Sequence, residues 1–209
     1  MNIIKPSEHV FVCGANGTGK TVLAKIYTAN NFDNVCVLDT KGTFKYEPFL
    51  QINKDYKLVT DINMLYNERK YNKIVYRPNI YQNSQEYYER FFEWCYKRTN
   101  TIVLVDEAMH VCDSYKIGFW YKSILTRGRE LNVACWSCTQ RPTNVSNFLL
   151  SESLHWFIFR LNNIDDRLKL VKSSGMADFK TSSTGHYFIY YNANYQGTTK
   201  RILDLGGKK

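Results

Sequence analysis

The sequence predicts an α/β protein with a mostly parallel sheet flanked by helices. Short apolar runs alternate along the chain with amphipathic stretches, which is the pattern of parallel strands joined by crossover helices. A glycine-rich segment at residues 14–21 follows the first apolar run and opens a helical pattern, as a strand–loop–helix unit requires. The chain has 209 residues and no repeat or linker, so we expect one domain that spans residues 1–209.

The apolar runs define the expected strands. Residues 102–105 are all apolar, so this strand should be buried on both faces of the sheet. A final antiparallel pair is expected from residues 186–191 and 201–205. The other strands are expected at residues 9–13, 35–38, 74–76, 133–137 and 156–159.

The amphipathic stretches define the expected helices. The clearest is at residues 84–97, where one face carries Tyr88, Phe91, Phe92 and Cys95. Asn83 and Glu86 resemble a capping box at its start. Lys97 and Arg98 suit the negative end of the helix dipole. Further helices are expected from Lys20 to about residue 30, and at residues 61–70, 117–131 and 164–173.

Composition and charge narrow the function classes. The chain is 44% hydrophobic and 22% charged, as in a soluble globular protein. Its formal net charge is +9, and residues 160–209 hold nine basic against four acidic residues, which indicates a polyanionic partner. A lysine-rich solvated surface is the alternative, and charge does not distinguish DNA, RNA and membrane surfaces. The 16 tyrosines and 12 phenylalanines fit an aromatic core better than a binding surface.

The cysteines and the N-terminus predict a protein of a reduced compartment, the cytosol. Cys13, Cys36 and Cys135 fall in expected strands and Cys138 directly follows one, and free cysteine in a strand behaves as a small buried apolar residue. Cys135 and Cys138 form a C-x-x-C pair, but residues three apart on a strand point to opposite faces, so the pair is a poor metal clip. The chain opens without a signal peptide, and no apolar run approaches the roughly 18 residues of a membrane span.

The strongest motif is Gly-Ala-Asn-Gly-Thr-Gly-Lys-Thr at residues 14–21, a full phosphate-binding-loop match. Its glycines let backbone N–H groups turn inward around phosphate oxygens, and the helix that follows adds its positive N-terminal end. Lys20 can reach the terminal phosphates, and the Thr21 hydroxyl can bind Mg²⁺. We therefore expect ATP and Mg²⁺ as cofactors rather than a chance glycine-rich turn. The expected nucleotide contacts are Gly14, Ala15, Asn16, Gly17, Thr18, Gly19, Lys20, Thr21 and Val22.

A second motif ends the apolar strand at residues 101–105. Asp106 follows at the carboxyl-end tip of this strand, where it would hold Mg²⁺ through its water shell. Glu107 is next, in position to orient and deprotonate the attacking water. An apolar strand that ends in Asp-Glu is a weak signal alone, but downstream of a phosphate-binding loop it is strong.

A third motif surrounds the strand at residues 133–137. Gln140 follows this strand and would lie next to the γ-phosphate, between the loop strand and the Asp106 strand. Arg127 and Arg129 precede it, and either is a candidate arginine finger for a neighbouring subunit. The alternative for both arginines is a solvated position at a helix end.

These motifs together resemble the HerA/FtsK superfamily of DNA-pumping ATPases, and within it the small viral genome-packaging ATPases. The resemblance extends in consistent order from about residue 10 to residue 167. The family usually has proline where this chain has Thr40. The matching segments are the phosphate-binding loop, Leu38-Asp39-Thr40-Lys41-Gly42, Val105-Asp106-Glu107-Ala108, Arg127-Gly128-Arg129 and Thr139-Gln140-Arg141-Pro142.

The resemblance implies a RecA-like P-loop fold of the additional-strand, catalytic-glutamate type. It implies that Glu107 is the hydrolytic base, that Gln140 senses the γ-phosphate, and that Arg127 or Arg129 acts in trans. It also implies a homo-oligomeric ring, a pentamer or hexamer, that threads double-stranded DNA. The expected function is an ATP-driven motor that packages a viral genome into a preformed capsid. Portal or capsid proteins are then partners, and the location is the host cytoplasm and transiently the portal vertex.

Two other functions stay open. A conjugative or plasmid DNA pump of the same superfamily would share these motifs. A small-molecule P-loop kinase is less favoured, because such kinases generally lack the Asp-Glu pair and use an arginine-rich lid. A nucleotide switch with little hydrolysis is disfavoured by Glu107.

Two weaker features have open interpretations. Lys41 and Lys45 follow the second strand and could line a DNA path, although a solvated loop is at least as reasonable. Asp165, Asp166 and Arg167 resemble a family position at the nucleotide-side interface. The favoured alternative is an acidic pair that starts a helix and complements its dipole.

Overall fold

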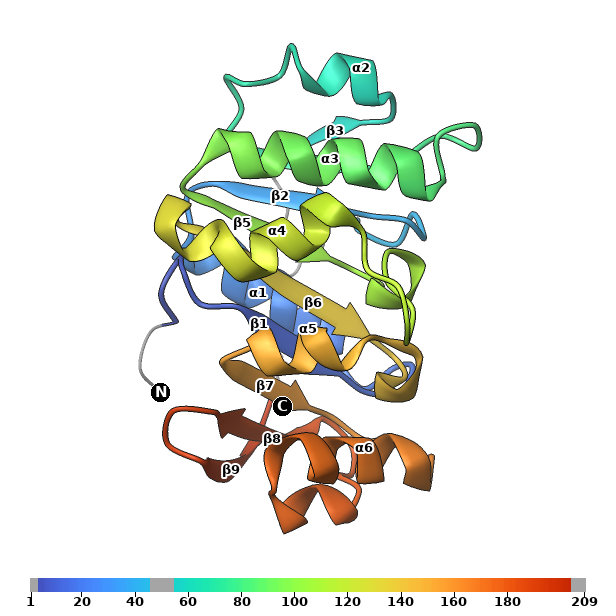
Figure 1. Ribbon diagram of the computed structural model, residues 1–209, viewed down its shortest axis with the longest axis vertical. Coiled ribbons are helices and arrows are strands. Elements are labelled where there is room, and N and C mark those ends of the chain that lie inside the picture. The colour runs from blue at the N-terminus through green and yellow to red at the C-terminus, as the bar shows by residue number, and fades with distance from the viewer. Residues whose placement is uncertain (1–3, 46–54, 204–209) are drawn as a thin grey trace, which may run out of the picture.

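The structure is a computed structural model that describes residues 4–45 and 55–203. These residues form one nine-stranded sheet in the order β3-β4-β2-β5-β6-β1-β7-β8-β9 (Figure 1). Neighbouring strands are parallel from β3 to β7 in that order, and β8 and β9 follow in antiparallel. The strands are β1 (Val10–Cys13), β2 (Val35–Leu38), β3 (Lys57–Val59), β4 (Lys73–Tyr76), β5 (Thr101–Val105), β6 (Val133–Thr139), β7 (His155–Ile158), β8 (Tyr187–Asn192) and β9 (Gly197–Ile202).

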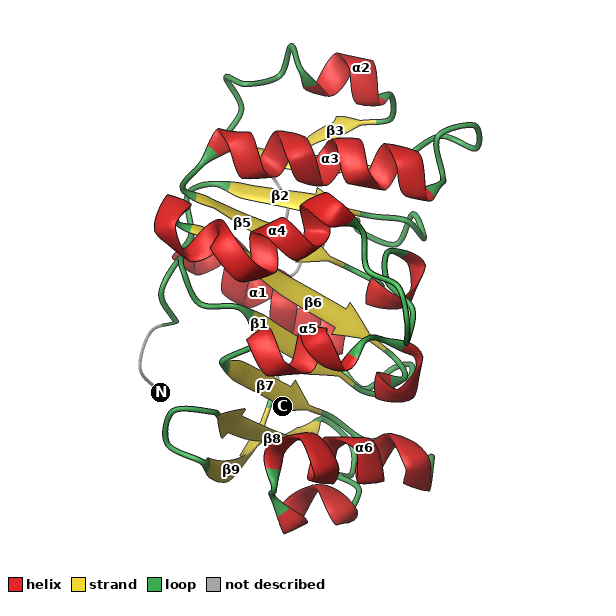
Figure 2. Cartoon of the chain, in the orientation of Figure 1, coloured by secondary structure: helices red, strands yellow, loops and turns green. Residues whose placement is uncertain are grey.

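Helices cover both faces of the sheet (Figure 2). One face is crossed by α3 (Gln85–Arg98), α4 (Phe119–Arg127) and α5 (Asn147–Glu152), and α1 (Lys20–Asn31) lies behind the other. The short α2 (Ile62–Leu65) lies near β3, and α6 (Ile164–Ser174) near the β7–β9 end. Four 3₁₀ turns complete the elements: η1 (Ala108–His110), η2 (Gly128–Leu131), η3 (Pro142–Asn144) and η4 (Ala177–Lys180).

The central strands are buried on both faces. On β1, Phe11 and Cys13 belong to the core cluster under α3 and α4, and Val10 and Val12 belong to the cluster against α1. All five residues of β5 are buried, and the unbroken apolar run at residues 102–105 predicted this for four of them. The α/β class, the mostly parallel sheet and the C-terminal antiparallel pair are therefore confirmed.

The two partners of the C–x–x–C pair lie on opposite faces of β6. Cys135 is in the cluster under α4, whereas Cys138 is in the cluster against α1. All six cysteines are buried free thiols. Burial raises the pKa of the Cys135 thiol to about 12, so these cysteines serve as apolar core residues.

Several boundaries differ from the predicted ones. The helix expected at residues 61–70 is the single turn α2, because only Ile62 and Leu65 in this segment contact the core. The helix expected at residues 117–131 begins at Phe119 and becomes the 3₁₀ turn η2 at Gly128. There the backbone of β6 comes so close that a Cβ on Gly128 would lie 2.2 Å from the Val133 carbonyl oxygen. The short β3 and α5 were not predicted.

The last strand was also misplaced. β9 begins at Gly197 rather than Arg201, because the tight turn between Asn192 and Gly197 pairs these two residues at once. Thr198 and Thr199 of β9 are polar, so no apolar run marks the start of this strand in the sequence. The end of the predicted strand, residues 204–205, lies outside the described residues.

The predicted capping box at α3 does not form. The N-cap is Ser84, which makes no side-chain cap hydrogen bond, and the Asn83 Oδ1 instead accepts from the Tyr88 hydroxyl at 2.6 Å. Glu86 remains in the first turn, where its charge suits the helix dipole. In residues 4–45 and 55–203, no helix is long and apolar enough to cross a lipid bilayer.

Candidate nucleotide site

Three strands bring the motifs together at one edge of the sheet. Cys13 on β1 aligns with Thr139 on β6, and Val105 on β5 aligns with Ser137. Because these strands are parallel, the segments that follow them leave the sheet at the same edge. The phosphate-binding loop, the Asp106–Glu107 pair and Gln140 therefore lie side by side.

The loop at residues 14–21 has the backbone of an anion cradle. Gly17 and Gly19 have φ values of 72° and 100°, which residues with a Cβ rarely adopt. The Ala15 N–H donates to the Arg160 carbonyl at 2.8 Å, which fixes the loop to the end of β7. α1 then begins at Lys20 with no side-chain cap and no acidic residue in its first turn. Its free N–H groups and positive dipole end are therefore open to an anion.

Lys20 and Thr21 are available to a phosphate and a cation. The Lys20 side chain is buried, yet its ammonium makes no hydrogen bond or ion pair with another described residue. The ammonium is therefore free to contact a bound polyanion. Thr21 is half-buried in the first turn of α1, and Val22 follows it.

Asp106 has the free oxygen that a divalent cation requires. Its Oδ2 accepts from the Thr43 hydroxyl at 2.7 Å. Its Oδ1 is buried and has no hydrogen-bond partner among the described residues. A buried carboxylate oxygen that is left unpaired is uncommon. Oxygen donors of this kind suit Mg²⁺, so Asp106 and the Thr21 hydroxyl fit the expected cation.

Glu107 is fully buried and held at both carboxylate oxygens. Its Oε1 accepts from the Thr139 hydroxyl at 2.9 Å and from the Gln140 N–H at 3.4 Å. Its Oε2 forms an ion pair with the Lys41 ammonium at 2.5 Å. Lys41 was expected in a DNA path or a solvated loop, but in the structure it contacts the expected catalytic base.

The turn that carries Lys41 is fixed by Asp39. The Asp39 carboxylate accepts from the Thr43 and Phe44 N–H groups and pairs with the Arg77 Nε at 2.8 Å. The Thr40 hydroxyl lies 2.6 Å from the His110 Nδ1. Burial lowers the pKa of His110, which favours the neutral form of its ring.

Removing the Lys41 charge should destabilise the fold. We expect Lys41→Met to lower the free energy of unfolding by about 2 kcal/mol, because it leaves the Glu107 carboxylate buried without a counter-charge. Urea denaturation at neutral pH measures this change. Lys97→Met is the matched control: the Lys97–Glu93 pair has the same 2.5 Å separation, but its lysine is 60% exposed. The control should lose less than about 0.5 kcal/mol.

A double variant tests the cause. Lys41→Met combined with Glu107→Gln should recover most of the lost stability, because no buried charge remains. A double variant as unstable as Lys41→Met alone would show that the lysine contributes packing rather than charge.

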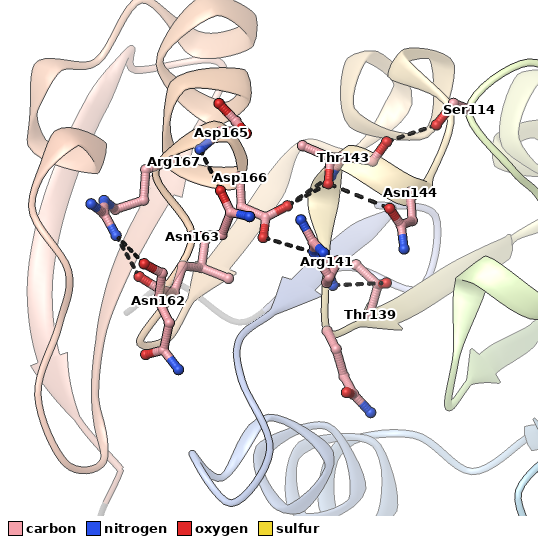
Figure 3. Close-up of polar contacts among 12 residues, drawn as sticks. Ser114, Thr139, Arg141, Thr143, Asn144, Asn162, Asn163, Asp165, Asp166 and Arg167 are labelled. Atoms are coloured by element: carbon pink, nitrogen blue, oxygen red, sulfur yellow. Dashed lines mark hydrogen bonds and ion pairs between the residues drawn. The ribbon is translucent and has the colours of Figure 1, made fainter.

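The turn after β6 is tied to the start of α6 (Figure 3). The buried Asp166 carboxylate pairs with the Arg141 Nε at 3.2 Å and accepts from the Thr143 hydroxyl at 2.6 Å. Arg167 donates to the Leu161 carbonyl at 2.7 Å. The acidic residues do start a helix, as one interpretation predicted, and Asp166 also fixes the turn that carries Gln140. This turn borders a pocket of about 500 Å³ whose lining includes Asn16, Gln140, Arg141 and Arg160.

Arg127 and Arg129 lie far from the phosphate-binding loop of their own chain. Both are exposed, at the end of α4 and in η2, which lead into the amino end of β6. From Val133 to Thr139 that strand extends about 20 Å at its usual rise of about 3.3 Å per residue. The structure thus places the phosphate-binding loop, Asp106, Glu107 and Gln140 together, and leaves the two arginines at the opposite edge.

Comparison with solved structures relates this arrangement to known proteins. The genome packaging NTPase B204 from Sulfolobus turreted icosahedral virus 2, in complex with sulfate, superposes with a TM-score of 0.80 at 15% sequence identity. The match covers 97% of this chain and 99% of that one. The same NTPase in complex with AMPPCP gives 0.79 at 16% identity, over 96% and 100% of the two chains. This chain has the fold of a genome-packaging NTPase.

More distant likenesses include a conjugation coupling protein and another ATPase. The pCW3 conjugation coupling protein TcpA, with ATPγS, has a TM-score of 0.61 at 11% identity over 93% of this chain and 59% of that chain. EssC (ATPases 2 and 3) from Geobacillus thermodenitrificans has 0.60 at 10% identity over 94% and 39%. No protein-family model and no curated protein sequence matches the chain. The fold expected from the HerA/FtsK resemblance is therefore confirmed by structure alone.

Sequence reasoning gave no role at the site to four residues, although one of them, Thr139, stands in a motif that it identified. Two of them contact the acidic pair through their hydroxyl groups: Thr43 contacts Asp106 and Thr139 contacts Glu107. The other two contact the phosphate-binding loop: Arg160 through its carbonyl, and His186, directly before β8, through its ring. Thr139 was detectable, because it is the last residue of the strand before Gln140. The other three come from segments whose approach depends on the three-dimensional fold.

Proposed function

We propose that the protein is a Mg²⁺-dependent ATPase that translocates double-stranded DNA. One observation carries this proposal: an open phosphate-binding loop lies beside a buried glutamate. The loop follows β1, and the glutamate, Glu107, follows β5, which is separated from β1 by β6 alone. A protein that only binds nucleotide has no use for a carboxylate base held in this position.

Each residue has a role in this mechanism. The loop N–H groups and Lys20 bind the β- and γ-phosphates, and the Asp106 and Thr21 oxygens would hold Mg²⁺. Bound Mg²⁺ supplies charge neutralisation at the phosphates. Glu107 orients a water and accepts its proton at Oε2. In this structure the same Oε2 contacts the Lys41 ammonium.

Gln140 fits the role of γ-phosphate sensor. Its N–H contacts the Glu107 carboxylate, and its side chain lines the pocket beside Asn16. A shift of Gln140 on hydrolysis would pass to Arg141 and Asp166 through the bonds that fix this turn. This connection offers a route from the phosphate to α6.

The cargo we propose is a viral genome moved into a preformed capsid. The support is that the packaging NTPase B204 matches over 99–100% of its own chain, and the net charge of +9 suits duplex DNA. In this proposal the chain works as a pentameric or hexameric ring with portal or capsid proteins as partners. It resides in the host cytoplasm and transiently at the portal vertex.

A conjugative or plasmid DNA pump is the second candidate, supported by the likeness to TcpA. That likeness covers only 59% of the coupling protein, so it supports the motor and leaves the cargo open. Both candidates share one test, the stimulation of phosphate release by duplex DNA. The genes beside this one distinguish them, because packaging requires capsid and portal genes and conjugation requires relaxase genes.

Binding to duplex DNA should depend strongly on salt and weakly on sequence. The logarithm of the association constant should fall with the logarithm of salt concentration by about 0.9 per phosphate contacted, hence by several units overall. Fluorescence anisotropy with two unrelated duplexes of equal length, at several salt concentrations, measures both properties. A slope near zero would exclude DNA as the partner and favour a small-substrate kinase.

A further inference from the structure

The C-terminal hairpin reaches back to the phosphate-binding loop. β8 runs antiparallel to β7, with Ile189 opposite Ile158, so its start lies at the edge where β7 ends. His186 comes directly before β8, and its Nδ1 lies 3.1 Å from the Thr18 carbonyl oxygen. Leu203 follows β9 and donates its N–H to the His186 carbonyl at 3.1 Å.

Both side chains cover the glycine that precedes α1. A Cβ on Gly19 would lie 2.8 Å from the Leu203 Cδ2 and 3.5 Å from the His186 Nδ1. Two residues from the far end of the chain therefore contact the cradle itself. Neither belongs to the phosphate-binding motif.

The order of the strands indicates which part of a bound nucleotide would lie next to His186 and Leu203. Asp106 and Glu107 follow β5, which is separated from β1 by β6, so the terminal phosphate must face the β5–β6 side of the loop. The nucleoside must then leave on the opposite side of β1. That side is formed by β7, β8 and β9, and it carries His186 and Leu203. This step rests on the proposed ATPase function.

The hydrogen bond to Thr18 sets the chemistry of His186. A carbonyl oxygen can only accept, so the His186 Nδ1 carries the hydrogen and donates it. In the neutral ring the Nε2 is then an acceptor, and the side chain is exposed. Ribose hydroxyls and the amino group of adenine are donors that match this nitrogen. Leu203 is half-buried and offers an apolar contact beside it.

We propose that His186 and Leu203 bind the nucleoside part of the substrate. The His186 Nε2 accepts a hydrogen bond from the ribose or the base, and Leu203 packs against the same group. The contact adds to affinity without touching the phosphates. The C-terminal hairpin is thereby part of the nucleotide site rather than an extension of the sheet.

The test compares ATP with inorganic tripolyphosphate, which has the phosphates and no nucleoside. The variant is His186→Asn, whose amide can still donate to the Thr18 carbonyl but has no ring and no Nε2. We expect it to weaken ATP binding about five- to tenfold and to leave tripolyphosphate binding unchanged. Leu203→Ala should act in the same direction. Competition with a fluorescent ATP analogue measures both ligands, and 2′-deoxy-ATP reveals whether the ribose hydroxyl is the donor.

Two controls separate this inference from the proposed function. Tyr195→Ala changes a residue that is 76% exposed on the turn of the same hairpin. This variant should change the affinity for neither ATP nor tripolyphosphate. Lys20→Ala should weaken ATP and tripolyphosphate alike, and failure to do so would contradict the nucleotide site itself. If His186→Asn and Leu203→Ala weaken both ligands equally, or neither, the nucleoside contact is excluded while the phosphate site stands.

Discussion

Replacing Glu107 with glutamine is expected to reduce ATP hydrolysis at least about 100-fold while ATP affinity stays close to that of the wild type. General-base catalysis typically contributes a factor of about 10²–10⁴. Glutamine keeps the shape of the side chain and a carbonyl oxygen for the Thr139 hydroxyl, so the strand ends should stay in place. Asp106 and Lys20 are unchanged, so the phosphates and the cation keep their ligands. Steady-state phosphate release and equilibrium ATP binding measure the two effects separately.

Two further variants control for this result. Lys20→Ala should weaken ATP binding itself, because it removes the charge next to the terminal phosphates. Thr139→Val keeps the carboxylate and removes only one of its hydrogen bonds, so its loss should be smaller than that of Glu107→Gln. Hydrolysis by Glu107→Gln at a rate near that of the wild type would refute the assignment of the base.

The proximity of these motifs could be predicted from the sequence for a topological reason. Asp106, Gln140 and the phosphate-binding loop each follow directly after an apolar run that forms a parallel strand. Parallel strands leave their carboxyl ends at one edge, so residues far apart along the chain meet without detailed knowledge of any loop. The spacing of apolar runs therefore predicted the neighbourhood as well as the fold.

The contact between Lys41 and Glu107 was not predicted, because it depends on a turn. The Asp39–Arg77 ion pair and two backbone N–H bonds to Asp39 fold that turn onto the Asp106–Glu107 pair. Arg77 is 38 residues away in sequence, and no local pattern connects the two. The same reason applies to His186, whose contact with Thr18 depends on a hairpin added at the far end of the sheet.

The helix at residues 61–70 failed for a different reason. Helical stability comes mostly from burying an apolar face, and after Leu65 this segment is polar or exposed. The remaining residues form turns, in which the Asn67 N–H donates to the Met64 carbonyl and the Tyr71 N–H to the Glu68 carbonyl. Local propensity predicted a helix, but too little apolar surface was available to extend it.

The second prediction concerns the arginines, and it separates a ring motor from a self-contained enzyme. Arg127→Ala or Arg129→Ala should reduce hydrolysis by a factor of about 10³ in a homo-oligomer while each chain still binds ATP. Both arginines lie at the end of the sheet opposite the phosphate-binding loop, so neither can reach the nucleotide of its own chain, and any contact with a nucleotide would be made in trans. Arg129 is the better candidate. Arg127 donates to the Ser123 hydroxyl at 3.0 Å, whereas the Arg129 side chain makes no hydrogen bond or ion pair within residues 4–45 and 55–203.

Mixing two inactive variants provides the decisive measurement. An Arg129→Ala subunit has an intact Glu107, and a Glu107→Gln subunit has an intact arginine. Where the first subunit's nucleotide faces the second subunit's arginine, one complete site forms, so the mixture should recover part of the wild-type activity. Specific activity of the wild type should also rise with protein concentration, because dilution separates the subunits that share a site. A self-contained enzyme has no such interface, and each variant chain would lack a group that it must supply to itself. Activity that is independent of concentration, together with no recovery in mixtures made with either arginine variant, would leave both arginines as solvated surface residues and exclude the shared site.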